Sequence, residues 1–271
     1  MSESKFHSTF TPIKRIILNK RWRIISWVAL ITYLIGMGTV LFFAYKGKNV
    51  QAVHVHISDT AQGFVTRQDI RQLLATGFQV DSQKVSQVDV SEVEDSIRAL
   101  PAVATAEAYI TGEGVLTVEI TPETPILRVI ATGGENFYLA RSGALIPYTP
   151  RYVPLVTVAN GNIGVPGPLP LHTGSVDCPA VLDDLYAIGK EIRSHNIWRA
   201  QIEQIYAKAN GEYELIPRIG AHVILLGKAH DVEWKFRKLM ALYKQGFTQT
   251  DWNKYEYINL KYKNQLVCTI R

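Results

Sequence analysis

The longest apolar run in the chain covers residues 24–45 and contains no charged residue. A helix rises about 1.5 Å per residue, so this run would be roughly 33 Å long and would cross a hydrocarbon core of about 30 Å. A cleaved signal peptide is the alternative, but the run is longer than an ordinary signal-peptide core and no A-x-A site follows it. We therefore predict a single membrane-spanning helix over residues 24–45, in contact with membrane lipid.

Basic residues just before this run predict its orientation. Lys20, Arg21 and Arg23 crowd its N-terminal side, and the positive-inside rule therefore puts residues 1–23 in the cytoplasm. The formal net charge of +5 has the same origin, because residues 1–23 hold six basic residues and one acidic residue. The remaining residues are neutral overall. Since nucleic-acid binding needs clustered excess positive charge, we do not expect it.

The chain after residue 46 shows strand and helix periodicities in turn. Residues 50–57 alternate between apolar and polar side chains, which is typical of a half-buried strand. Thr66 and Asp69 have the spacing of a capping box at a helix start, and Gly77 predicts the end of that helix. A second helix over residues 89–100 and a hairpin over residues 103–110 and 115–120 complete the order β-α-α-β-β.

Pro122 and Pro125 predict a hinge between two domains, residues 46–124 and 125–271, because proline cannot donate a hydrogen bond to a sheet. The second domain has many short strand patterns and two helix patterns. Asn210-Gly211 predicts a type I′ turn within it. The expected segments are strands 126–130, 137–139 and 145–146, loop 160–170, helix 181–195, hairpin 202–207 and 213–216, strand 223–226, helix 232–243 and hairpin 255–262 and 266–270. We therefore predict an α+β fold in which this domain is mainly antiparallel β with flanking helices.

Candidate chemistry is sparse. The chain has no G-x-S-x-G, Walker, H-E-x-x-H or S-x-x-K motif. His54 and His56 share a strand face, but no third metal ligand is identifiable. Cys178 and Cys268 could form one disulfide, although a buried free thiol at Cys268 is the preferred interpretation. We expect no catalytic residue, metal or cofactor.

The last hairpin carries the strongest binding signal. Alternation predicts that Ile258, Leu260 and Tyr262 face the core while Tyr257 and Lys261 face outward. The final strand should lie at a sheet edge, whose unpaired backbone groups invite strand addition by a partner. An ordinary closing strand, blunted by its basic residues, fits these residues equally well.

Two stretches resemble a known family. Residues 100–106 read L-P-A-V-A-T-A and residues 116–126 read L-T-V-E-I-T-P-E-T-P-I, which is similar to the signature L-P-x-V-x-x-A … L-x-I-x-V-x-E-x-x-P of the bacterial cell-division family FtsQ/DivIB. Ala102 stands where that family often has Trp. The resemblance implies that residues 46–124 form a polypeptide-transport-associated (POTRA) domain. It also implies a bitopic, non-catalytic scaffold of the division complex at the septum of the inner membrane, with its C-terminus in the periplasm.

The family resemblance extends to the closing residues. Residues 257–264, Y-I-N-L-K-Y-K-N, resemble the family's Y-x-D-L-R-Y-x-x-G, where FtsB and, with it, FtsL bind. Lys261 replaces an Arg, which removes bidentate pairing with a carboxylate, and Ile270 replaces an aromatic residue. The resemblance implies partner-binding roles for Tyr257, Lys261, Tyr262, Asn264, Thr269 and Ile270.

Two classes of function therefore remain open. The first is this scaffold, which would bind FtsB-like and FtsL-like proteins and other division proteins through its POTRA-like domain. The second is a membrane-anchored periplasmic hydrolase or binding module whose site the sequence conceals.

Overall fold

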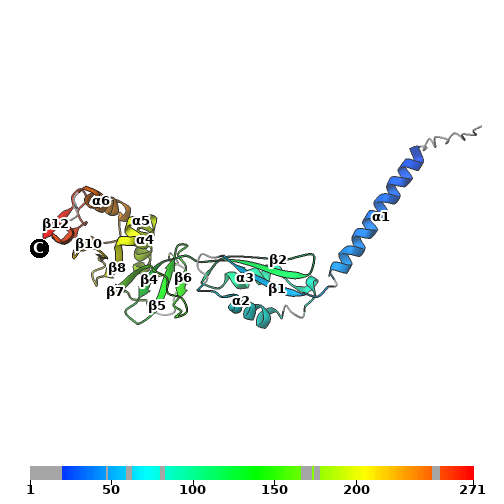
Figure 1. Ribbon diagram of the computed structural model, residues 1–271, viewed down its shortest axis with the longest axis horizontal. Helices are drawn as coiled ribbons and strands as arrows, with labels where there is room; N and C mark the ends of the chain where they lie inside the picture. Colours follow the sequence, from blue (N-terminus) through cyan, green and yellow to red (C-terminus); the bar gives the residue numbers. More distant parts are fainter. Residues whose placement is uncertain are drawn as a thin grey trace, which may run out of the picture.

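The structure is a computed structural model. It describes residues 20–46, 48–58, 63–79, 83–165, 173, 178–245 and 251–271. Most of the predicted cytoplasmic tail, and the predicted loop after Val165, lie outside these residues. Figure 1 shows an extended arrangement, with α1 at one end and the C-terminus at the other. Two folded units follow α1, which we name the three-stranded unit and the nine-stranded unit after their sheets.

Helix α1 spans Lys20–Lys46. Its segment Ile24–Phe43 is apolar and long enough to cross a membrane, and none of that segment is buried against the rest of the protein. An isolated apolar helix in water would expose all of these side chains, so a lipid environment accounts for their composition. The predicted membrane-spanning segment therefore corresponds to a helix that fits a single-pass anchor.

The three-stranded unit has the predicted order of elements. Its sheet order is β1-β3-β2, in which β1 pairs parallel with β3 and β2 pairs antiparallel with β3. The elements are β1 (Ala52–Ile57), α2 (Arg67–Leu73), a π-helical turn (Leu74–Phe78), a 3₁₀ turn (Val85–Gln87), α3 (Val90–Arg98), β2 (Val103–Ile110) and β3 (Val115–Pro122).

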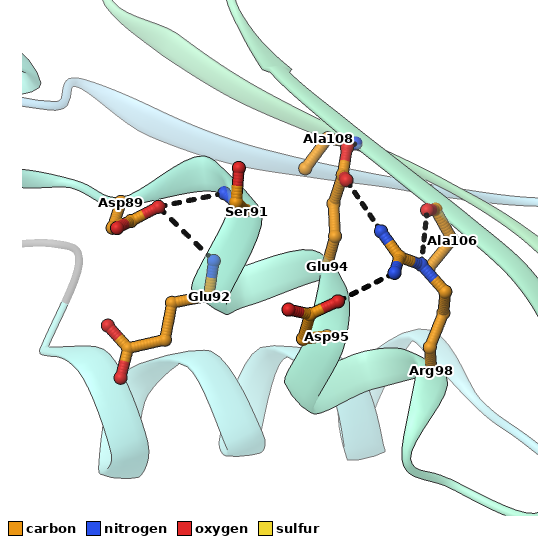
Figure 2. A network of polar contacts seen from close by, with 8 residues as sticks. All are labelled: Asp89, Ser91, Glu92, Glu94, Asp95, Arg98, Ala106 and Ala108. Carbon is orange, nitrogen blue, oxygen red and sulfur yellow. Dashed lines mark hydrogen bonds and ion pairs between the residues drawn. The ribbon is translucent and has the colours of Figure 1, made fainter.

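The helices of this unit begin where their capping residues predict. The Thr66 side chain accepts a hydrogen bond from the Asp69 N–H, and the Asp69 carboxylate accepts one from the Thr66 N–H, so the capping box is confirmed. Asp89 caps α3 by accepting from the backbone N–H groups of Ser91 and Glu92 (Figure 2). Gly77 lies within the π-helical turn and does not end α2, so that expectation was wrong.

Strand β2 lies at an edge of the three-stranded sheet, and α3 covers its backbone with two side chains (Figure 2). Glu94 Oε1 accepts a hydrogen bond from the Ala108 N–H at 2.8 Å, and Arg98 Nε donates one to the Ala106 carbonyl at 3.5 Å. Arg98 also pairs with Glu94 and Asp95. These side chains occupy the Ala106 C=O and the Ala108 N–H that a neighbouring strand would use, so they close this part of the edge to strand addition.

The nine-stranded unit contains one mixed sheet. Among the described residues its order is β12-β11-β10-β9-β8-β7-β4-β5-β6, with parallel pairs β4–β7, β7–β8 and β10–β11 and antiparallel pairs elsewhere. The strands are β4 (Pro125–Ile130), β5 (Asn136–Ala140), β6 (Leu145–Pro147), β7 (Thr157–Gly161), β8 (Ile202–Ala207), β9 (Tyr213–Pro217), β10 (Val223–Gly227), β11 (Tyr255–Asn259) and β12 (Val267–Ile270). The predicted mainly antiparallel β domain is thus confirmed.

Three helices cover one face of this sheet. They are α4 (Ala180–Ser194), α5 (Asn196–Gln201) and α6 (Val232–Gln245), and a 3₁₀ turn (Asp251–Asn253) precedes β11. Trp198 of α5 is fully buried, with its ring centroid 5.6 Å from that of Phe236 in α6. Leu127 and Ile258 from the sheet belong to the same apolar core. The helices therefore seal one face of the sheet.

The two units are packed against each other. The Phe64 ring lies 5.2 Å from the Tyr138 ring and 4.9 Å from the Tyr152 ring, measured between centroids. Arg151 pairs with Asp69 at 3.3 Å across the same junction. Between Pro122 and Pro125, the Glu123 side chain is buried and accepts a hydrogen bond from the Ser142 hydroxyl. The two prolines therefore lie at a packed junction between the units, and the hinge at this position stays a prediction.

Two local expectations in the nine-stranded unit were wrong. Asn160 and Gly161, expected in a loop, belong to β7, which lies between β4 and β8 in the sheet. Asn210-Gly211 does not form a type I′ turn, since Gly211 has φ +74° while Asn210 has no positive φ. Lys208 and Glu212 instead close a longer loop in which Gly211 takes the left-handed position.

Candidate partner-binding edge

The closing hairpin consists of β11, residues 260–266 and β12. Strand β12 lies at the edge of the nine-stranded sheet, where it pairs with β11. The register places Tyr257 opposite Thr269 and Ile258 opposite Cys268. Directly opposed residues point to the same side of a sheet, so Tyr257 and Thr269 share the face away from the core.

The backbone of β12 has an open side. The Arg271 N–H donates to the Lys254 carbonyl, toward β11. Because N–H groups alternate in direction along a strand, those of Ile270 and Cys268 point toward the edge. No described residue donates to or accepts from this side of β12. The edge therefore offers an unpaired ladder to a partner.

Helix α6 holds the hairpin loop through one partly buried lysine side chain. Lys238 Nζ donates to the carbonyls of Leu260 at 3.1 Å, of Gln265 at 3.5 Å and of Tyr262 at a shorter distance. Desolvation lowers the pKa of Lys238. Three carbonyls on one ammonium fix the loop that leads into β12, so Lys238 positions the edge strand.

Trp234 forms a second contact between α6 and the loop. Its Nε1 donates to the Lys263 carbonyl at 3.0 Å, and the Arg237 guanidinium lies 4.9 Å from its ring centroid. Trp234 and Tyr262 line one small hollow of about 140 Å³. Sequence reasoning missed Trp234, although a large aromatic residue off the apolar stripe of a helix was the available signal.

A groove of about 490 Å³ lies between α6 and the hairpin. Ala241 and Leu242 line it from the helix, and Leu266 and Cys268 line it from the hairpin. No disulfide joins Cys178 and Cys268, and partial burial raises the pKa of Cys268. The expectation of a free thiol at Cys268 is confirmed, although the side chain is only half-buried.

Lys261 has an ion-pair partner within the chain. Its Nζ lies 2.6 Å from Glu212 Oε2, and this hydrogen bond lowers the pKa of Glu212. Gly227 of β10 has φ +75°, and a Cβ there would lie 2.9 Å from Lys261 Cγ. Gly227 thus leaves room for the Lys261 stem to lie across β10.

The six predicted site residues are all exposed at one end of the sheet. Tyr257 and Thr269 lie on the open face, Tyr262 and Asn264 lie in the loop, and Ile270 is 64% exposed at the end of β12. Ile258 and Leu260 are buried as predicted, but Tyr262 is 49% exposed and does not face the core. Strand β11 ends at Asn259, so strand alternation no longer determines where Tyr262 points. The binding roles of these residues stay predictions.

The described residues contain no group of three or more metal-ligating side chains. The arrangement at the hairpin consists of a backbone edge, an apolar groove and scattered cationic side chains. A backbone edge beside an apolar groove is typical of surfaces that bind an extended peptide.

An apolar helix that fits a single-pass anchor, a β-α-α-β-β unit and a terminal mixed sheet define a class of α+β protein with two folded units after a membrane anchor. A family model described as POTRA-like domain matches residues 49–121, and one described as FtsQ/DivIB, C-terminal related matches residues 124–269. The second match covers more than half of the chain, so the chain belongs to the FtsQ/DivIB family. A search of curated proteins found no match. The family indicates a division-related protein that interacts with other proteins and is generally a non-catalytic scaffold.

Proposed function

We propose that the chain is a single-pass, non-catalytic scaffold of the bacterial division complex that binds FtsB-like and FtsL-like bitopic proteins through its closing hairpin. In this proposal residues 1–23 lie in the cytoplasm, and residues 46–124 and 125–271 form two periplasmic domains. Lys20, Arg21 and Arg23 support this orientation through the positive-inside rule. The POTRA-like domain would bind further division proteins at the septum of the inner membrane.

The open edge of β12 is the observation that carries the proposal. A partner strand added to β12 would pair with outward backbone groups of Cys268 and Ile270 and continue the sheet order beyond β12. The exposed Ile270 side chain would be covered in the same step. Lys238 and Trp234 hold the loop in place before binding, which reduces the ordering cost of association.

Substitution of two exposed side chains tests the site. We expect Tyr262→Ala and Ile270→Ala each to weaken the affinity of the full chain for its FtsB-like partner at least tenfold, or about 1.4 kcal/mol, as for interface hot spots. The measurement is a titration of both proteins in detergent micelles, with circular dichroism to verify the fold. Tyr206→Ala is the matched control, because Tyr206 is 42% exposed on β8, which is three strands from β11 in the sheet. Unchanged affinity in both hairpin variants would remove the proposal.

Two experiments test location. Protease treatment of intact spheroplasts should degrade the C-terminal region while leaving the N-terminal tail protected. A fluorescent fusion should concentrate at midcell in dividing cells, and depletion should give filaments or chains. Uniform membrane fluorescence with normal septation would favour the envelope hydrolase or binding module instead.

A further inference from the structure

A second concave site lies in the nine-stranded unit, remote from the closing hairpin. It is a pocket of about 360 Å³ where α4 ends and α5 meets the sheet. Four arginines from four separate segments of the chain line it, which we name the arginine pocket: Arg128 (β4), Arg193 (last turn of α4), Arg199 (α5) and Arg218 (after β9). The Arg128 guanidinium donates to Asn136 and lies over the Tyr148 ring, so the positive charge available to a ligand rests on Arg193, Arg199 and Arg218.

The positive charge of this pocket is not neutralised within the chain. Within the described residues, Arg193, Arg199 and Arg218 have no ion-pair partner, although Glu203 also lines the pocket. Burial, and then the positive charges of Arg199 and Arg141, lower the pKa of Arg193. Gathering like charges around a partly desolvated Arg193 costs folding free energy, so packing alone does not account for the cluster.

The other wall of the pocket is apolar and has free backbone groups. Val153 and Leu155 are 52% and 98% exposed. These two residues precede β7, and within the described residues their backbone groups make no hydrogen bond. Exposed apolar side chains next to unpaired backbone N–H and C=O groups form a surface that an extended peptide can cover.

We propose that the arginine pocket binds an acidic peptide segment of a partner protein, in which at least two carboxylates face the arginines and an apolar residue covers Leu155. Guanidinium groups pair with carboxylates in a bidentate manner, which gives geometric selection in addition to attraction. The segment would lie against Val153 and Leu155 with its backbone extended.

The position of the pocket favours a peptide over a lipid headgroup. In Figure 1, strands β4, β7 and β8 are separated from α1 by the three-stranded unit. Headgroup phosphates at the end of α1 are therefore far from the pocket. This inference does not depend on the proposed role of the closing hairpin, because the two sites share no residue.

The test uses the full chain in nanodiscs of zwitterionic lipid and a phage-displayed library of random heptapeptides. We expect enriched peptides to carry two or more Asp or Glu residues next to an apolar residue. A synthetic peptide of the enriched sequence should bind at least tenfold more weakly to Arg193→Glu/Arg199→Glu, and its Asn/Gln counterpart should not bind the wild-type chain. Arg199→Gln/Arg218→Gln, at two exposed positions, provides a milder variant if the charge reversal unfolds the chain.

Controls separate the alternatives. Arg67→Glu/Arg71→Glu makes the same change of net charge on exposed residues of α2 and should leave peptide binding unchanged. Ile270→Ala should also leave it unchanged. Enriched peptides without acidic residues, or equal binding to both charge-reversed variants, would overturn the proposal. Binding of purified cell-wall sacculi that depends on Arg193 and Arg199, with no acidic peptide enriched, would assign the pocket to a wall polymer instead.

Discussion

The two sheets of this protein treat their edges in opposite ways. At β2, α3 reaches over the edge, and Glu94 and Arg98 occupy the backbone groups of Ala108 and Ala106. At β12, α6 lies beside the edge, but its Lys238 binds carbonyls of the loop and leaves the strand uncovered. Both helices lie next to an edge strand, so proximity of a helix does not decide whether an edge is closed. The direction of one or two long polar side chains decides it.

A substitution that loosens the packing of α3 on the sheet should have the largest effect, because α3 closes the edge at β2. Ile97 is fully buried between α3 and the sheet, and Ile97→Ala should lower the free energy of unfolding by about 2–5 kcal/mol through the cavity it leaves. Denaturant unfolding followed by circular dichroism measures this. Ile219→Ala is the control, because Ile219 is 54% exposed, and should change stability by less than about 0.5 kcal/mol. Equal effects of both substitutions would show that α3 does not hold β2.

Removing an outward N–H from β12 should weaken partner binding further than truncating a side chain. Ile270→Pro lacks the N–H that points to the open edge, and proline is tolerated where that group faces solvent. We expect its affinity for the FtsB-like partner to fall about tenfold below that of Ile270→Ala, or about 1.4 kcal/mol. The same titration compares the two variants. Equal affinities would mean that the partner does not pair with the backbone of β12.

Opening the closed edge should have a moderate cost. Glu94→Ala leaves the Ala108 N–H without its acceptor, and we expect a loss of about 1–2 kcal/mol of stability. Asp95→Ala is the matched control one residue away on α3. The Asp95 side chain is 72% exposed, so its surface ion pair with Arg98 should contribute less than about 1 kcal/mol. Thermal or chemical unfolding of the two variants separates these values. The same loss from both would contradict a specific role for Glu94.

The smallest expected effect is a dependence of stability on pH, confined to the part of the nine-stranded sheet near β12. His222 is buried next to Tyr243 of α6 and Trp252 before β11, and burial lowers its pKa. The unfolded chain therefore binds a proton below about pH 6.5 that the folded chain does not. Stability should fall as the pH drops from about 6.5 toward the folded pKa, by at most about 1.4 kcal/mol per pH unit.

Hydrogen exchange at pH 7.5 and 5.5 locates this effect. Exchange in β10, β11 and α6 should accelerate at pH 5.5, and His222→Asn should remove the difference. Exchange in β2 should not respond in the same way. Acceleration in His222→Asn equal to that of the wild type would assign the pH effect to other groups.

Local signals in the sequence predicted much of the fold. Thr66 and Asp69 carry a short-range hydrogen-bond pattern that determines a helix start, and the structure contains it. Strand β7 was missed because its place depends on parallel pairing with β4 and β8, which are distant in sequence. Composition near Asn160 instead indicated a loop. Long-range pairing of this kind leaves no periodic signal in five residues.

The candidate site was predicted only in part. Alternation placed Ile258 and Leu260 correctly in the core, and failed at Tyr262 because the chain leaves the strand after Asn259. Trp234 and Lys238 contact the hairpin from 22–29 residues away in sequence, and such contacts depend on how α6 packs on the sheet. The arginine pocket was missed for the same reason, since its arginines come from four separate segments of the chain.

The junction of Phe64, Tyr138 and Tyr152 has a mechanical consequence. Because the two units are packed through these aromatic rings, the junction sets the position of β12 relative to the three-stranded unit. If the chain binds a bitopic partner as proposed, the binding segment of that partner would have to reach β12 at the distance from the membrane that this junction sets. The length of the partner's stalk would then be a criterion for recognition, independent of the chemistry of the contact.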